Sequence, residues 1–394
     1  MLSQPEAAGG TLVSLELSRP RASTLTQSNE NMNTIGRELR HNPLYWLLVF
    51  VPVVGVANSV KPEAHTALFL LSILAIVPLA ALLSRATESV AAKTGDAIGG
   101  LLNATLGNLT ELVIAITALR AGMLDLVKAS LIGAVVTNSL FMLGGAFLLG
   151  GLKHHKQEFN PANARTQAGM LLLATIALVV PSAVARVDQL NVTSVMLPLS
   201  LGIACILLAT YALSLLFSLK THRDVFAGVG GDGDQHEEKP WPLSFALGAL
   251  AIATLGIAYV SEIFVESVQQ AAVTLGMSKA FVGFIVVALV GAAAEMATAF
   301  SAARKNRLDL SVGVAMGSSA QIALFVAPAL LILSYFVAPT PMDLNFGGGQ
   351  VLVVLLTTLT VSFVVAGGRA AWYSGIQLLA VYAIFAVTAY LIPG

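Results

Sequence analysis

Long apolar stretches recur along this chain from Leu44 to Ile392. A helix needs about 20 apolar residues to cross ~30 Å of hydrocarbon, and most of these stretches have that length. Only 11% of the residues are charged and the mean hydropathy is +0.82. The pattern predicts an all-α integral membrane protein, because a helix satisfies its own backbone hydrogen bonds within lipid.

Charged residues, Gly and Pro divide the apolar stretches into eleven predicted transmembrane helices. Six are expected near 44–60, 64–84, 97–119, 125–150, 167–185 and 194–219. Five more are expected near 243–272, 280–303, 309–337, 350–367 and 371–392. We therefore expect a leading helix within 44–63 and two five-helix repeats, over 64–219 and 243–394.

Two polar segments flank the first repeat. Residues 1–43 mix Arg with Glu and lack the apolar core of a secretory signal, which predicts a disordered cytosolic tail. Residues 220–242 include the acidic, glycine-rich run GVGGDGDQHEEKP, which is typical of a flexible cytosolic linker. Low-affinity calcium sensing is the alternative for this linker, although the EF-hand spacing is absent.

The distribution of Lys and Arg predicts the orientation. With the amino terminus in the cytosol, sixteen of these residues fall inside and five outside, namely Lys61, Arg120, Lys128, Arg186 and Lys279. This asymmetry satisfies the positive-inside rule. With eleven helices, the carboxyl terminus is then expected outside.

Several classes of protein are disfavoured by the composition. The 21 basic residues balance the 21 acidic ones, so nothing indicates a nucleic-acid partner. The single cysteine, Cys205, lies in an apolar stretch and allows neither an intrachain disulfide nor a thiolate cluster, and we expect no cofactor. Neither an HExxH motif nor a Ser/His pair was found, so an enzyme is not expected. His154 and His155 are expected in an inside-facing loop.

A shift of 184 positions aligns two segments of the chain, GNLTELVIAITALRAGMLDL and GAAAEMATAFSAARKNRLDL. The shift pairs Gly107 with Gly291, Glu111 with Glu295, Arg120 with Arg304 and Asp125 with Asp309. Our helix count puts Arg120 outside and Arg304 inside, so the copies are expected to run in opposite directions. Transporters use such inverted repeats to expose one midplane site to either side in turn.

Glu111 and Glu295 each lie in the middle of an apolar stretch. An acidic side chain at the centre of a membrane helix costs roughly 2.5 to 3.5 kcal/mol on insertion scales, which makes each glutamate a candidate functional residue. The alternative is a glutamate that is paired for folding alone. The empty pair is expected to retain at least one proton, because two adjacent carboxylates cannot both ionise cheaply.

A glycine precedes each glutamate by four residues, at Gly107 and Gly291. Glycine would let the helix unwind and free backbone carbonyls next to the carboxylate. Such hard oxygen ligands suit Ca²⁺, which takes six to eight oxygens at about 2.3 to 2.6 Å. Close packing of helices through small residues is the alternative role of these glycines.

Further polar residues interrupt the apolar stretch that follows each glutamate. They would support the site or simply bond neighbouring helices, and both readings remain open. They are Thr137, Asn138 and Ser139 in the first copy, and Ser318, Ser319 and Gln321 in the second.

Four more acids lie near helix ends or in apolar stretches. Glu88 is expected near the inner end of the second helix and Glu262 in the inner half of the seventh, where they would relay protons or attract cations. An ion pair with Arg85 is the alternative for Glu88. Asp125 and Asp309 are expected to cap helices.

The two repeat segments, with VKASLIGAVVTNSLFMLGGAFLLGG and KNRLDLSVGVAMGSSAQIALFVAP, resemble the signature repeats of the calcium/proton (CAX) exchangers of the cation/calcium exchanger superfamily. The resemblance covers nearly the whole chain and implies a leading helix plus two inverted five-helix repeats. It further implies that Glu111 and Glu295 bind the ion, that Gly107, Asn108 and backbone around Gly291 line the site, and that Ser318 and Gln321 assist. Glu88 and Glu262 match further acidic positions, and Asn138 is placed with them on the ion pathway.

The chain departs from the family pattern next to the second glutamate, where Ala292 and Met296 stand in place of the usual Asn and His. The resemblance implies a multi-pass location, in the cell membrane of a bacterium or a vacuolar-type membrane of a eukaryote. The expected partners are Ca²⁺, protons and the lipid bilayer, with a homo-oligomer as a further expectation. Sodium/calcium or monovalent cation/proton exchange on the same scaffold stays open as the alternative, and a channel is a third option.

Overall fold

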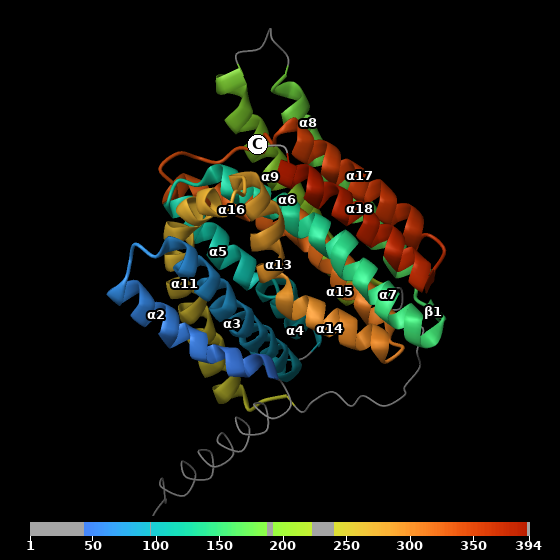
Figure 1. Cartoon of the computed structure of the whole chain (residues 1–394). Helices are drawn as coiled ribbons and strands as arrows, with labels where there is room; N and C mark the ends of the chain where they lie inside the picture. The colour runs from blue at the N-terminus through green and yellow to red at the C-terminus, as the bar shows by residue number, and fades with distance from the viewer. Residues whose placement is uncertain (1–42, 95, 187–191, 223–239, 392–394) are drawn as a thin grey trace, which may run out of the picture. The chain divides into compact units, whose positions relative to one another are not determined.

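The computed structural model describes residues 43–94, 96–186, 192–222 and 240–391 (Figure 1). Within these ranges, nine helices are long and apolar enough to cross a membrane, and two bent helix pairs bring the number of spans to eleven. The predicted all-α membrane class is confirmed, and eleven spans agree with the predicted number. Residues 1–42 of the predicted tail and 223–239 of the predicted linker lie outside the described residues.

The helices of the first half follow the predicted stretches in order. They are η1 (Pro43–Val49), α2 (Phe50–Val60), α3 (His65–Thr94), α4 (Asp96–Leu106), α5 (Leu109–Arg120), α6 (Leu124–Val136), η2 (Thr137–Met142), α7 (Leu143–His154), α8 (Pro161–Val184), α9 (Val192–Leu216) and η3 (Phe217–Thr221).

The helices of the second half do the same. They are α11 (Leu243–Thr274), α12 (Lys279–Phe281), η4 (Val282–Val287), α13 (Ala288–Gly291), α14 (Ala293–Arg304), α15 (Leu308–Gln321), η5 (Ile322–Val326), α16 (Ala327–Val337), α17 (Gly348–Val365) and α18 (Trp372–Leu391).

Three predicted boundaries were wrong. Helix α8 begins at Pro161, before the expected start near residue 167. Helix α3 continues to Thr94, past the expected end near residue 84, and α7 continues through His154, which was expected in a loop. In both places polar residues end the apolar stretch without ending the helix. A helix that leaves the hydrocarbon can continue in water, where charged side chains are compatible with helical backbone.

The repeat that the sequence predicts is also present in the secondary structure. Helix α14 begins and ends 184 positions after α5, and α15 begins 184 positions after α6. The first pair of half-helices bends by 41° between Leu106 and Leu109, and the second by 61° between Gly291 and Ala293. The breaks predicted from the two glycines are therefore confirmed.

Within the described residues, four spans contain a π-helical turn, at η2, η3, η4 and η5. A π turn is wider than an α turn and occurs frequently at functional sites. The turn η2 contains Asn138 and Ser139, and η5 begins directly after Gln321. Two of the π turns, η2 and η5, therefore lie at the polar residues of the repeats, a feature that apolar periodicity did not predict.

The two longest helices, α3 and α11, pack against each other, and α2 lies beside α3 (Figure 1). Phe69 of α3 stacks on Phe264 of α11 with ring centroids 5.3 Å apart. Gly256 of α11 allows the side chain of Leu79 to approach within 3.1 Å of where a Cβ would stand. Helix α11 also packs against α5, which places it beside a half-helix that carries a candidate glutamate.

A short two-stranded sheet was not predicted. Strand β1 (Lys156–Glu158) pairs antiparallel with β2 (Arg369–Ala371), and it joins the segment after α7 to the segment before α18. Both segments were assigned to the cytosolic side from the helix count, and their pairing agrees with that assignment. Helices α7 and α18 pack together above this sheet (Figure 1).

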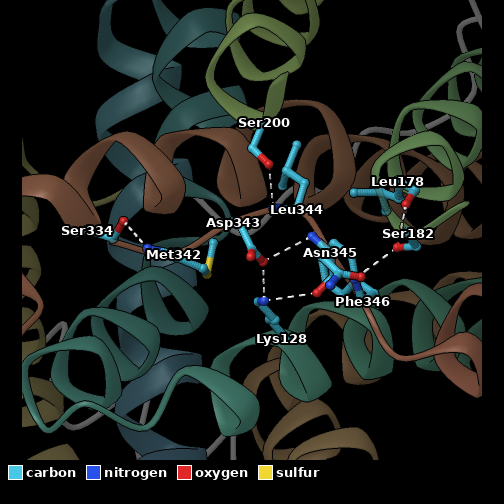
Figure 2. A network of polar contacts seen from close by, with 10 residues as sticks. All are labelled: Lys128, Leu178, Ser182, Ser200, Ser334, Met342, Asp343, Leu344, Asn345 and Phe346. Atoms are coloured by element: carbon cyan, nitrogen blue, oxygen red, sulfur yellow. Dashed lines mark hydrogen bonds and ion pairs between the residues drawn. The ribbon is translucent and has the colours of Figure 1, made fainter. Parts of the chain in front are cut away.

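The segment between α16 and α17, residues 338–347, forms an extended strap across four helices (Figure 2). Met342, Leu344 and Phe346 are fully buried, and their amides donate to the hydroxyls of serines in α16, α9 and α8, namely Ser334, Ser200 and Ser182. Lys128 of α6 forms an ion pair with Asp343 and donates to the Asn345 carbonyl at 2.9 Å. Serine hydroxyls thus satisfy backbone that has no strand partner, which lets irregular chain lie among helices.

Candidate functional site

The two predicted glutamates occupy equivalent places. Glu111 lies in the first turn of α5 and Glu295 in the first turn of α14, each directly after a helix break. The free amides and the positive end of the helix dipole at such a terminus favour a negative charge. Each half of the chain therefore contributes one carboxylate at a helix amino terminus.

The side chain of Glu111 crosses to the other half of the chain. A Cβ at Gly291 would stand 2.9 Å from Glu111 Cγ and 3.0 Å from its Oε1, so only glycine leaves room for this carboxylate. Glu295 follows Gly291 by four residues, on the other side of the second break. The structure thus brings together Glu111, Gly291 and Glu295, as predicted.

The Oε2 atom of Glu295 is buried and has no hydrogen-bond partner among the described residues. An unpaired buried carboxylate oxygen is costly, because the group has lost its hydration without compensation. A bound cation or a proton on the carboxyl group would remove that cost. This atom is therefore the place in the pair where a positive charge would stabilise the structure most.

A chain of hydrogen bonds crosses between the repeats beside the glutamates. Asn138 donates to Ser318 at 2.9 Å, Ser318 donates to Asn108 Oδ1 at 3.0 Å, and Asn108 donates to Gln321 Oε1 at 2.6 Å. All four residues were predicted near the site, and the structure brings them together. The Oδ1 atom of Asn138 is buried without a partner among the described residues, so it is available as an oxygen ligand.

Two further buried contacts surround this chain of hydrogen bonds. The hydroxyls of Ser139 and Ser319 lie 2.9 Å apart, and Thr137 Oγ1 lies 3.4 Å from the Tyr382 hydroxyl. Ser139 and Ser319 satisfy each other across η2 and α15. Ser139, Ser319 and Thr137 therefore form hydrogen bonds between helices, which is one of the two roles expected for the polar residues of the repeats.

The breaks differ where the sequence departs from the family pattern. Ala292 stands at the position of Asn108 and is fully buried, but it offers no polar atom. Met296 is partly buried and packs against the hydrophobic core. The second break therefore contributes backbone and Glu295, without a neighbouring polar side chain from these two positions.

The acids Glu88 and Glu262 lie away from the glutamate pair, and each faces an arginine. Arg85 Nη1 is 3.9 Å from Glu88 Oε2, the ion pair that we considered as the alternative for Glu88. Glu262 was expected in the inner half of its helix, and that prediction was wrong. Its carboxylate lies 3.9 Å from Arg120, which ends α5 on the side assigned to the outside. Glu262 lies past the midpoint of α11, which begins at Leu243 on the side assigned to the inside, so the helix count itself places it in the outer half.

The predicted caps need a similar correction. Asp125 and Asp309 lie in the first turns of α6 and α15, but the residues at the cap positions are Met123 and Arg307. Asp309 accepts a hydrogen bond from the Asn160 amide across the fold. Their charges still lie at the positive ends of the helix dipoles.

No group of three His, Cys, Asp or Glu side chains in the described part of the chain is placed to hold a metal ion. The available ligands are hard oxygens with at most two negative charges. They are the carboxylates of Glu111 and Glu295, the free Oδ1 of Asn138 and carbonyls at the breaks. Such a set suits a divalent cation that keeps part of its hydration and can leave again. Sequence reasoning missed one residue here, Tyr211, whose hydroxyl donates to the Ala104 carbonyl at 2.8 Å beside the first break.

Comparison with known proteins identifies the class of protein. A family model described as sodium/calcium exchanger protein matches residues 64–220 and 245–391. The chain belongs to this family. The two matched ranges correspond to the two predicted repeats and leave out the predicted linker between them.

Individual relatives and a solved structure match most of the chain. A Ca²⁺/H⁺ antiporter of Synechocystis is 41% identical over 362 residues, which are 88% of this chain and 96% of that protein. A vacuolar calcium ion transporter of Schizosaccharomyces pombe is 35% identical over 88% of this chain and 84% of its own length. A solved structure of native YfkE superposes with a TM-score of 0.76 at 37% identity, over 89% of this chain and all of that chain. The resemblance to calcium/proton exchangers that the repeat segments predicted is confirmed.

Proposed function

We propose that this protein is a Ca²⁺/H⁺ antiporter in which Glu111 and Glu295 bind the transported ions. The observation that carries the proposal is the meeting of Glu111 with Gly291, four residues before Glu295, at the two helix breaks. The names of the relatives support the same ions. Transport uses the pair as ligands, so the protein acts as a carrier and no resident cofactor is required.

The glutamate pair couples the two ions by exclusion. Two neighbouring carboxylates in a site with little water do not both stay ionised without a cation, so the empty site holds at least one proton. Ca²⁺ binds when that proton leaves, and a proton returns when Ca²⁺ leaves. One set of oxygens therefore serves both ions, and neither can be bound while the other occupies the site.

The remaining predicted residues act around this pair. Asn138 offers its unpaired Oδ1, and carbonyls at Gly107 and Gly291 complete an oxygen shell. Ser318 and Gln321 hold Asn108 through hydrogen bonds, so they support the site rather than supplying all of its ligands. Glu88 and Glu262 attract cations toward the two mouths of the pathway, each balanced by its arginine.

Alternating access exposes the pair to one side at a time through the inverted repeats. With the amino terminus in the cytosol, proton entry down its gradient would drive Ca²⁺ out of the cytosol. The membrane would be the cell membrane of a bacterium or a vacuolar-type membrane of a eukaryote. A homo-oligomer remains a prediction.

Sodium/calcium or monovalent cation/proton exchange is the second candidate. One observation favours protons: Asn108 donates to Gln321 Oε1 and so occupies the oxygen that Gln321 would offer to Na⁺. A neutral amide at this place also adds no charge for a third cation. The absence of a third carboxylate near the pair agrees with this reading, within the described residues.

The test uses purified protein in vesicles loaded at acidic pH. Uptake of Ca²⁺ driven by the pH gradient, without sodium and with saturation, is expected. Apparent Ca²⁺ affinity should weaken as pH falls, because protons and Ca²⁺ compete for the same oxygens. A requirement for sodium would favour the second candidate, and uptake that does not saturate would indicate a channel.

A further inference from the structure

Tyr211 lies outside the glutamate pair, yet it bonds the backbone at the first helix break. It belongs to α9, its side chain is 5% exposed, and its hydroxyl donates to the Ala104 carbonyl at 2.8 Å. Ala104 stands four residues before Asn108. In a continuous helix, the carbonyl of Ala104 would accept from the amide of Asn108.

The second break shows what happens without such a contact. There the amide of Ala292 donates to the Ala288 carbonyl at 3.1 Å, and these residues lie 184 positions after Asn108 and Ala104. Within the described residues, no backbone carbonyl accepts from the Asn108 amide. The helical bond that the second break keeps is replaced in the first break by the tyrosine hydroxyl.

The backbone differs accordingly. Asn108 has φ −102° and ψ 27°, whereas Ala292 has φ −77° and ψ 2°. The bends also differ, 41° at the first break and 61° at the second. Glu111 follows Asn108 by three residues, so the backbone of Asn108 sets the direction in which Glu111 reaches Gly291.

A ring contact fixes the hydroxyl of Tyr211 in place. Its ring stacks on Phe325 of η5, with centroids 5.3 Å apart and planes at 25°. Phe325 follows Gln321 by four residues, and Gln321 is bonded to Asn108. Tyr211 therefore joins three elements around the first break: α9, α4 and η5.

From this geometry we infer that Tyr211 is a positioning residue for ion binding, which holds the Ala104 carbonyl away from the Asn108 amide and so sets the place of Glu111. The inference rests on the proposed function and deepens it. The hydroxyl also takes the Ala104 carbonyl out of the set of possible ion ligands. The counterpart in the second repeat is Tyr382 of α18, whose ring lies 5.1 Å from Phe141, the residue 184 positions before Phe325. Its hydroxyl lies 3.4 Å from Thr137 Oγ1, so the repeat keeps the ring contact but pairs the hydroxyl differently.

The test is Tyr211→Phe, which keeps the ring and its stacking on Phe325 and removes only the hydroxyl. Without the hydroxyl, the Ala104 carbonyl is expected to accept from the Asn108 amide, which would shift the backbone that places Glu111. The KM for Ca²⁺ is therefore expected to rise by about tenfold while kcat changes little. Thr175→Val is the matched control, because it removes a buried hydroxyl that lies 2.7 Å from Thr358, between α8 and α17. This control should keep the wild-type KM.

A structure of Tyr211→Phe gives a readout that does not depend on transport. The Asn108 amide should then bond the Ala104 carbonyl, and the first bend should move from 41° toward the 61° of the second break. An unchanged KM together with an unchanged bend would overturn the inference, as would an equal rise in KM for Thr175→Val. Wild-type protein that shows no proton-driven Ca²⁺ uptake would instead overturn the proposed function and leave the bend measurement valid.

Discussion

The two helix breaks occupy equivalent places in the repeats, yet different contacts hold them. The first break is bonded by side chains: Asn108 to Gln321 and Ser318, and Tyr211 to Ala104. The second keeps its backbone hydrogen bond at Ala292 and leaves the Glu295 Oε2 atom without a partner among the described residues. The repeat thus supplies the frame and two charges, whereas its asymmetric side chains give the first break the hydrogen bonds that the second break lacks.

The substitutions with the largest expected effect test whether the carboxylate of each half is equally necessary for transport. Glu111→Gln and Glu295→Gln should each abolish proton-driven Ca²⁺ uptake, because leaving a buried ion with one counter-charge costs about 3 kcal/mol or more, over a hundredfold in affinity. Uptake by reconstituted variants, normalised to inserted protein, measures this loss. Full uptake by either variant would contradict the assignment of the pair.

A second substitution tests the contact between the halves. Gly291→Ala would place a Cβ 2.9 Å from Glu111 Cγ and displace the carboxylate. Overpacking costs about 1 to 3 kcal/mol, so Ca²⁺ affinity should fall by about tenfold or more. Gly313→Ala in α15 is the matched control, because a Cβ there meets nothing within 4 Å. Calcium titration of both variants distinguishes two roles of Gly291. The glycine either leaves room for the Glu111 carboxylate or only allows the helix to end there.

A third substitution makes the first break resemble the second. Asn108→Ala removes the donor to Gln321 and the acceptor for Ser318 and leaves both side chains with an unmet bond. We expect a fall in Ca²⁺ affinity of about fivefold to tenfold, from a loss of about 1 kcal/mol or slightly more. The expected loss is smaller than that for the glutamates because both charges remain. A variant with wild-type affinity would show that the polar contacts of the first break do not position the site.

The smallest expected effect on affinity comes from the strap of residues 338–347 (Figure 2), which lies apart from both breaks. Lys128→Met removes the ion pair with Asp343 and should lower the melting temperature by several degrees, because a half-buried carboxylate loses its partner at a cost of about 1 to 3 kcal/mol. The KM for Ca²⁺ should stay within about twofold of wild type, since 0.4 kcal/mol is about twofold. Lys61→Met, at an exposed turn, serves as the control for loss of charge alone. A large change in KM for Lys128→Met would mean that loss of any polar contact disturbs the site. The effects of substitutions at the two breaks could then not be assigned to the breaks themselves.

Much of the fold could be predicted because lipid imposes simple rules. The length of the apolar stretches and the rarity of charge predicted eleven spans, and the shift of 184 positions predicted two equivalent glutamates after two glycines. Local chemistry is sufficient for these features. A membrane helix satisfies its own backbone hydrogen bonds, and a charged side chain within it is costly and therefore marks a functional position. Where water took over from lipid, as at Thr94 and His154, the same rules misplaced the helix ends.

Other features depended on contacts between residues far apart in the chain. The contact of Glu262 with Arg120 could not be predicted from their positions in the chain, and Tyr211 was indistinguishable from any aromatic residue in an apolar stretch. The π turns and the pairing of β1 with β2 likewise follow from packing between distant segments. The sequence by itself determined the membrane helices, their repeat and the two charges, because each depends on composition or local spacing. Only the tertiary structure decided which oxygens are paired and which remain free for an ion, because a hydrogen bond depends on where two distant segments meet.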